Sequence, residues 1–142
     1  MNWLVRRLLH GRQVPRVIDP QSHKVLDFLV TGFFLIVAGA TWGTHKRAAA
    51  TALLNAGAVF GATMLTDYDG DGSKPIPFPT HGKIDMAQAG MASGLPVLMG
   101  FAGHPVAAVF QAQALSELLV ISATDWEANQ RERAEDWDRF AA

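Results

Sequence analysis

Long stretches of this chain contain no charged side chain, and this feature restricts its fold more than any other. Residues 28–45, 48–66 and 86–116 contain no Asp, Glu, Lys or Arg. After the third stretch, Glu117 is the only charged residue before Asp125. A helix needs roughly 20 apolar residues to cross about 30 Å of hydrocarbon. We therefore predict an all-α integral membrane protein, a four-helix bundle with spans over about residues 25–44, 47–66, 84–102 and 105–124.

The absence of polar faces and the composition exclude several other classes of protein. Helices of a soluble bundle, the alternative fold, normally have a polar stripe, which these segments lack. The 142 residues include 12 basic and 13 acidic side chains, so the bulk positive charge typical of nucleic-acid binding is absent. There is no cysteine, which excludes disulfides, thiolate metal sites and cysteine nucleophiles. Any chemistry must therefore come from His, carboxylate and amide groups.

Basic residues are concentrated on one side of the predicted spans. Ten of the twelve lie in the N-terminal tail, the loop over residues 67–83 and the C-terminal tail. The other side has only Lys46 and Arg47. The positive-inside rule then places both termini in the cytoplasm, with the spans in a bacterial inner membrane.

Both ends of the chain are predicted to lie at the membrane surface. Residues 1–21 form an interfacial segment with apolar and charged side chains on opposite faces. Residues 127–142 form a charged amphipathic tail. Trp126, Trp137 and Phe140 lie on one stripe of a helix through this region, which suits contact with the membrane or a partner.

The sequence contains a candidate internal repeat. Residues 22–68 align with residues 80–126 without a gap, and the polar ends match best. Each segment begins with Ser or Thr, then His, three residues and Asp, and each ends in Thr-Asp-aromatic. We predict two tandem transmembrane hairpins, joined by an Asp/Gly/Pro-rich loop over residues 69–79 and related by a pseudo-twofold axis along the membrane normal.

This repeat predicts a symmetric group of polar residues at the cytoplasmic ends of the spans. In each hairpin, the His and the first Asp are four positions apart and so share one helix face. The group can bind a divalent metal or relay protons. In the structural alternative, Ser22 and Thr80 cap the helices and the His/Asp pairs are simply interfacial. The members of the group are His23, Asp27, His81, Asp85, Asp67 and Asp125.

The middle loop contains a second, weaker metal candidate. Asp67, Asp69 and Asp71, with Gly72 after them, match the first positions of a calcium-binding loop. The bidentate Glu expected at the twelfth position is replaced by Phe78, and prolines intervene. Because Asp-Gly pairs are also common in turns, a plain turn is the favoured interpretation.

A further set of polar side chains lies inside the predicted spans. Its members are Glu117, Gln113, Asn55 and Gln88. An ionised acid in hydrocarbon costs on the order of a few kcal/mol, so Glu117 is expected to face the interior of the bundle. The set indicates either a proton or ion path, or a polar pocket, or hydrogen bonds that hold the helices together.

Pairs of glycines four positions apart recur in three of the spans. In lipid, such pairs let helix backbones approach closely. We therefore predict that they pack the helices, and that the chain forms a homo-oligomer or part of a larger membrane complex. The pairs are Gly39 and Gly43, Gly57 and Gly61, and Gly90 and Gly94.

The leading functional interpretation is noncatalytic. The sequence has no phosphate-binding loop, no serine-hydrolase elbow and no HExxH motif. We expect an accessory or assembly subunit embedded in the bilayer. One alternative is a proton- or ion-coupled transport module that uses Glu117 and the His/Asp face. Another is a metal-dependent membrane enzyme at the cytoplasmic rim. No cofactor is strongly implied, although a divalent metal fits the available side chains.

Overall fold

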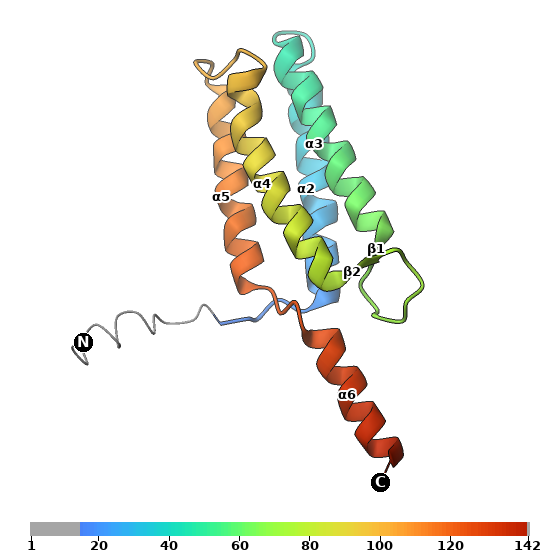
Figure 1. The fold of residues 1–142 in the computed structure, drawn as a ribbon. Helices are drawn as coiled ribbons and strands as arrows, with labels where there is room; N and C mark the ends of the chain where they lie inside the picture. The colour runs from blue at the N-terminus through green and yellow to red at the C-terminus, as the bar shows by residue number, and fades with distance from the viewer. Residues whose placement is uncertain (1–14, 142) are drawn as a thin grey trace, which may run out of the picture.

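A computed structural model describes residues 15–141, in which helices predominate. Helices α2 (Pro20–Thr41), α3 (Lys46–Leu65), α4 (Phe78–Leu98) and α5 (Val106–Ala123) run alternately up and down in a bundle (Figure 1). Helix α6 (Ala128–Ala141) extends away from one end. Most of the predicted N-terminal interfacial segment lies outside the described residues.

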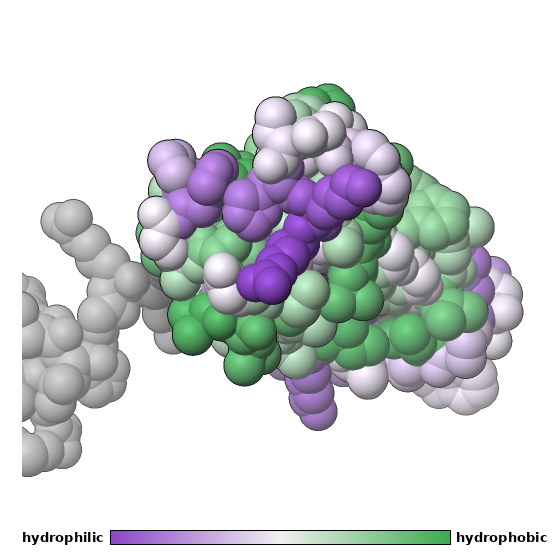
Figure 2. All heavy atoms as spheres, turned by 90° about the horizontal axis from the view of Figure 1, so that it is seen from above, coloured by the Kyte–Doolittle hydropathy of each residue, from purple (hydrophilic) through white to green (hydrophobic). Residues whose placement is uncertain are grey.

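Three of the helices, α2, α3 and α5, are long and apolar enough to cross a membrane. Large apolar side chains cover their outer faces: Leu29, Ile36 and Leu119 are 63%, 73% and 70% exposed. Such contiguous apolar surface is typical of contact with lipid. Figure 2 shows hydrophilic residues gathered on the end formed by the α2–α3 and α4–α5 loops. The prediction of an all-helical protein with membrane-spanning helices is therefore confirmed.

Helices α2 and α4 begin earlier than the sequence predicts. Asp19 caps α2, because its Oδ1 accepts hydrogen bonds of 2.9 Å from the backbone N–H groups of residues 21 and 22. Pro20 follows at the first helical position, where its missing N–H costs nothing. Helix α4 begins at Phe78, directly after Pro77. Ser22 and Thr80 therefore lie inside the helices, and the prediction that they are the caps is wrong.

Two short backbone pairings hold the loops at the end of the bundle where the described termini lie. Strand β1 (Thr66–Asp67) pairs in parallel with β2 (Ile76–Pro77), and Thr66 lies opposite Ile76. An isolated bridge pairs Ile18 with Thr124 in the same parallel sense. In the alignment of the two predicted repeats, Thr124 corresponds to Thr66, and the same shift brings Ile18 onto Ile76. The segments that enter and leave the helices are thus fixed in equivalent ways on both sides of the bundle.

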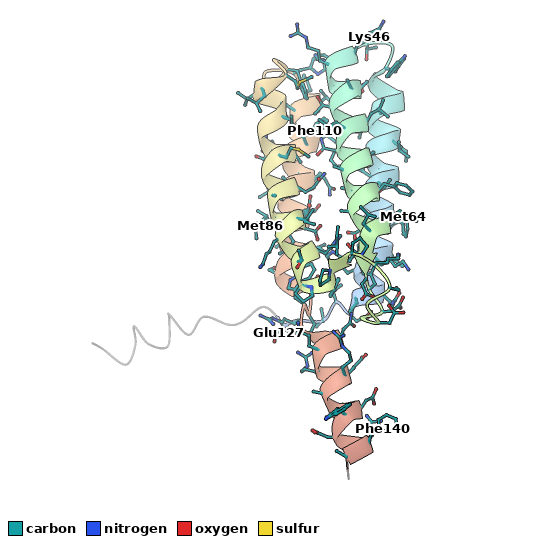
Figure 3. The ribbon with its side chains drawn as sticks, turned by 45° about the vertical axis from the view of Figure 1, so that its right-hand side comes forward. Lys46, Met64, Met86, Phe110, Glu127 and Phe140 are labelled. Carbon is teal, nitrogen blue, oxygen red and sulfur yellow. The ribbon has the colours of Figure 1, made fainter. Side chains whose placement is uncertain are left out.

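Alanine forms the close helix contacts of this bundle. Ala48, Ala52 and Ala56 are buried on one face of α3, four positions apart. They pack in a core with Phe34 and Phe110, whose ring centres are 5.5 Å apart. Phe110 lies between the helices in Figure 3. Small side chains at this spacing let backbones approach, the role expected of glycine.

The GxxxG glycines do not lie at these contacts. At none of the six would a Cβ atom lie within 4 Å of any described atom beyond the neighbouring residues and the backbone of its own helix. The prediction that they pack the helices of this chain together is therefore wrong. Their faces remain uncovered within the described part of the monomer. The six positions are Gly39, Gly43, Gly57, Gly61, Gly90 and Gly94.

Candidate metal centre

Four buried side chains from α2 and α4 meet at the end of the bundle that carries β1 and β2. They are His23, Asp27, His81 and Asp85, called here the His/Asp cluster, and their exposure lies between 1% and 8%. His23 Nε2 is 3.0 Å from Asp85 Oδ2, and His81 Nε2 is 3.0 Å from Asp27 Oδ2. Within each helix, the corresponding His–Asp distances are 3.4 Å and 3.2 Å. The sequence predicted these four residues as one group, and the fold brings them into contact.

Two threonines fix the orientation of the imidazole rings. Thr66 Oγ1 donates its proton to the Ala62 carbonyl at 2.6 Å and lies 2.8 Å from His81 Nδ1. With its proton used in this way, the hydroxyl accepts a hydrogen bond from Nδ1–H. Thr124 does the same for His23, at 2.9 Å, while it donates to the backbone carbonyl of residue 120 at 2.7 Å. Both rings therefore carry a proton on Nδ1.

The position of the proton on each imidazole determines whether Nε2 faces the carboxylate with a proton or with a lone pair. A neutral imidazole with a proton on Nδ1 has a lone pair on Nε2. That lone pair would lie 3.0 Å from a carboxylate oxygen in both halves of the cluster, which is repulsive. A proton or a cation must therefore lie between nitrogen and oxygen. It is either one proton shared within each imidazole–carboxylate pair, or a shared metal cation.

The distances suit a shared metal ion. One ligand atom from each of the four residues can be chosen so that all lie within 4.8 Å of one another. Tetrahedral zinc with bond lengths of about 2.0–2.1 Å separates its ligand atoms by about 3.3 Å. The four His–Asp distances, from 3.0 to 3.4 Å, are close to this value, although they involve both oxygens of each carboxylate. Two imidazoles and two carboxylates match divalent first-row metals such as Zn²⁺.

Tyr68 supports the cluster from the loop after α3. Its hydroxyl donates to Asp27 Oδ2 at 2.6 Å, and its side chain is almost fully buried. Burial, followed by the charge of Asp27, raises the pKa of Tyr68 above its ordinary value. The phenol therefore remains a donor and orients the carboxylate, as outer groups commonly do around metal ligands.

Two of the six predicted group members, Asp67 and Asp125, lie elsewhere. Asp67 accepts hydrogen bonds from the backbone N–H groups of residues 70 and 72, at 2.8 and 2.7 Å. Asp125 pairs with Arg131, which lowers the pKa of this carboxyl. In the Thr-Asp-aromatic motif, the threonine contacts the cluster and the aspartate does not. The repeated motif therefore does contain a residue of the site, but this residue is the threonine and not the aspartate that we predicted.

The candidate calcium loop forms a turn. Asp69 accepts from Gln21 Nε2 at 2.7 Å, and Asp71 accepts from the backbone N–H of Ser73 at 2.8 Å. Each of these carboxylates, and that of Asp67, therefore accepts a hydrogen bond from another part of the protein. In residues 15–141, the His/Asp cluster is the one group of side chains arranged to hold a metal ion.

The four polar residues inside the spans separate into two pairs. Gln88 Nε2 donates to Asn55 Oδ1 at 3.2 Å, which joins α4 to α3. On α5, Gln113 and Glu117 instead line a cavity beside the cluster. Gln113 Nε2 and Glu117 Oε2 have no hydrogen-bond partner among residues 15–141. The four residues that the sequence grouped therefore do not form one hydrogen-bonded set within residues 15–141.

Trp126 forms part of the wall of the site, whereas Trp137 and Phe140 do not. Its ring centre is 4.8 Å from those of His23 and Phe78. Trp137 and Phe140, on α6, are 75% and 90% exposed, and Phe140 lies at the far end of this helix (Figure 3). The predicted single stripe of three aromatic side chains is therefore wrong, because Trp126 lies before α6 and packs inward.

Substitution of Gly82 by Ala is expected to destabilise the protein by about 1–3 kcal/mol, as overpacking commonly does. An added Cβ would lie 2.9 Å from two ring carbons of Trp126. This ring cannot move freely, because its Nε1 donates to the Ile121 carbonyl at 3.0 Å. Thermal unfolding in detergent measures the effect. Gly90→Ala on the same helix is the matched control, since apart from the backbone of its own helix no atom of residues 15–141 lies within 4 Å of its Cβ position. Equal unfolding temperatures for the two variants would contradict the prediction.

Comparison of the chain with models of protein families, with curated proteins and with solved structures gives no match. The fold and the site themselves define the class: a helical membrane protein with a buried His/Asp centre at one end of its bundle.

Proposed function

We propose that this chain is a small four-span protein of the bacterial inner membrane that binds one divalent transition-metal ion in the His/Asp cluster. One observation carries the proposal. Two imidazoles, oriented by threonine, direct Nε2 at two buried carboxylates from distances of 3.0 Å. A cation between these atoms turns a repulsive contact into four metal–ligand bonds.

The function proposed for this metal is structural. Four protein ligands complete a tetrahedral site, as in structural zinc sites, whereas catalytic sites keep a position open. His23 and Asp27 come from the first hairpin, and His81 and Asp85 from the second. The metal would therefore join the two hairpins, which agrees with the noncatalytic role expected from the sequence. Transport and catalysis at the rim remain the alternatives.

Three further features of this proposal concern the membrane and the origin of the chain. Helix α4 packs along α5, so we include it as the fourth span. The described termini and the loop with β1 and β2 share one end, which the excess of basic residues places in the cytoplasm. The contacts of His23 with Thr124 and of His81 with Thr66 join equivalent positions of the two repeats, which supports an origin by duplication of one hairpin.

The uncovered glycine faces support association of this chain with a second copy or with a larger membrane complex. In lipid, exposed small residues four positions apart offer a surface that a partner helix can approach closely. This is the accessory or assembly role expected from the sequence. The oligomeric state of the purified protein, measured by size exclusion with light scattering, tests it.

Elemental analysis of the full-length protein, purified in detergent after incubation with Zn²⁺, tests the metal. We expect about one ion per chain. His81→Ala and Asp85→Asn should each lose it, since each removes one of four ligands. His104→Ala is the matched control, because His104 is an exposed residue of the α4–α5 loop. Absence of zinc from the wild-type protein, or its retention by both cluster variants, would show that the cluster is only an ion-pair network.

A further inference from the structure

A small cavity lies directly beside the His/Asp cluster, between α2 and α5. Its volume is about 30 Å³, enough for one or two water molecules. His23, Asp27 and Asp85 line one part of it, and Gln113 and Glu117 line another. The cavity therefore lies between the cluster and the side chains of Gln113 and Glu117. Gln113 Nε2 and Glu117 Oε2 have no hydrogen-bond partner within the described residues.

These polar groups are not explained by helix packing. Gln113 is only 9% exposed, yet its Nε2 has no hydrogen-bond partner within the described residues. A buried amide donor without a partner loses the hydrogen bonds that it would make in water, which destabilises the fold. Glu117 Oε2 is likewise buried and unpartnered there. Groups of this kind are normally satisfied by ordered water or by a ligand.

The equivalent place on the other side of the bundle contains a pair of hydrogen-bonded amides. Asn55 is the counterpart of Gln113 in the first repeat, and it receives a hydrogen bond from Gln88 of α4. The counterpart of Gln88 is Val30, which lines the cavity. On that side two amides pair. On the cavity side the residue equivalent to Gln88 is a valine, which cannot form a hydrogen bond to Gln113, and Gln113 Nε2 has no partner within the described residues.

We propose that this cavity is the hydrated passage through which a divalent cation reaches the cluster, with Glu117 as its transient ligand. The inference rests on the proposed metal function. A cation that approaches four buried ligands must exchange its water shell for protein oxygens. The Glu117 carboxylate supplies such an oxygen, and the cavity has room for the water that the ion still carries. Glu117 thus acts on the rate of loading, while the four cluster residues determine the affinity.

Stopped-flow absorbance with Co²⁺ as the probe tests this passage in the full-length protein in detergent. For Glu117→Gln we expect association and dissociation to slow together by about tenfold, with Kd changed less than threefold. Gln113→Leu, which makes the cavity apolar, should slow both rates in the same direction. Glu132→Gln is the matched control, because it removes one acid from the exposed surface of α6.

Each outcome separates this inference from the proposed function. If the wild-type protein binds Co²⁺ and both cavity variants load at its rate, the passage is wrong and the metal site stands. A weaker Kd for Glu117→Gln with an unchanged association rate would make Glu117 a ligand of the bound ion, which also overturns the passage. If the wild-type protein binds no Co²⁺, the proposed metal function fails and this inference fails with it.

Discussion

Saturating Zn²⁺ is expected to raise the unfolding temperature of the full-length protein by roughly 10 °C. A ligand that binds only the folded state stabilises it by about 4 kcal/mol at a thousand times its Kd, and each kcal/mol shifts the midpoint by about 2–4 °C at this chain length. The folded site joins α2 to α4, whereas the unfolded chain separates His23 and Asp85 by 62 residues. The metal should therefore add a second link between two hairpins that already share the apolar core around Phe34 and Phe110.

Variants of the cluster should lose this shift. In Asp27→Asn and Asp85→Asn, an amide replaces a charged ligand with almost no change in shape, so the fold is expected to survive. Their unfolding temperatures should be the same with and without Zn²⁺. Asp125→Asn is the matched control, because Asp125 pairs with Arg131 outside the cluster and should leave the zinc shift intact. A zinc shift that persists in both cluster variants would place the ion elsewhere on the protein.

Removal of the two threonine hydroxyls is expected to weaken Zn²⁺ binding by about 10–100-fold for each substitution. In Thr66→Val or Thr124→Val, the Nδ1–H of His81 or His23 loses its acceptor. The ring can then rotate or move its proton to Nε2, the atom that must bind the metal. Zinc titration against a chelator of known affinity measures the change, and the ligands themselves remain in place.

Thr51→Val provides the matched control for these substitutions. Thr51 is also buried, and its hydroxyl also donates to the carbonyl four positions earlier, at 2.8 Å, but within residues 15–141 it makes no hydrogen bond to a histidine. We expect Thr51→Val to change the stability of the protein by about as much as Thr66→Val or Thr124→Val. Unlike them, it should bind Zn²⁺ like the wild-type protein. If all three threonine variants bind equally well, the hydroxyls do not orient the imidazoles and the tautomer argument is wrong.

The sequence predicted the helical membrane fold because charge-free stretches of sufficient length have few other stable structures. It also predicted the four members of the cluster, since His23 with Asp27 and His81 with Asp85 occur at the same helical spacing. Helix starts were less predictable. Asp19 and Ser22 are both good capping residues, and only the path of the backbone before α2 selects Asp19.

The sequence by itself determined which segments are apolar helices and which chemistry is available, because hydropathy and the absence of cysteine are properties of composition and local order. The tertiary structure decided which of these side chains contact one another. Thr124 reaches His23, and Thr66 reaches His81, only because the hairpins pack with their polar ends together. The packing also joins Gln88 to Asn55 on one side and leaves a cavity at Glu117 on the other. Local sequence cannot specify such contacts, since they depend on which helix faces meet across the bundle.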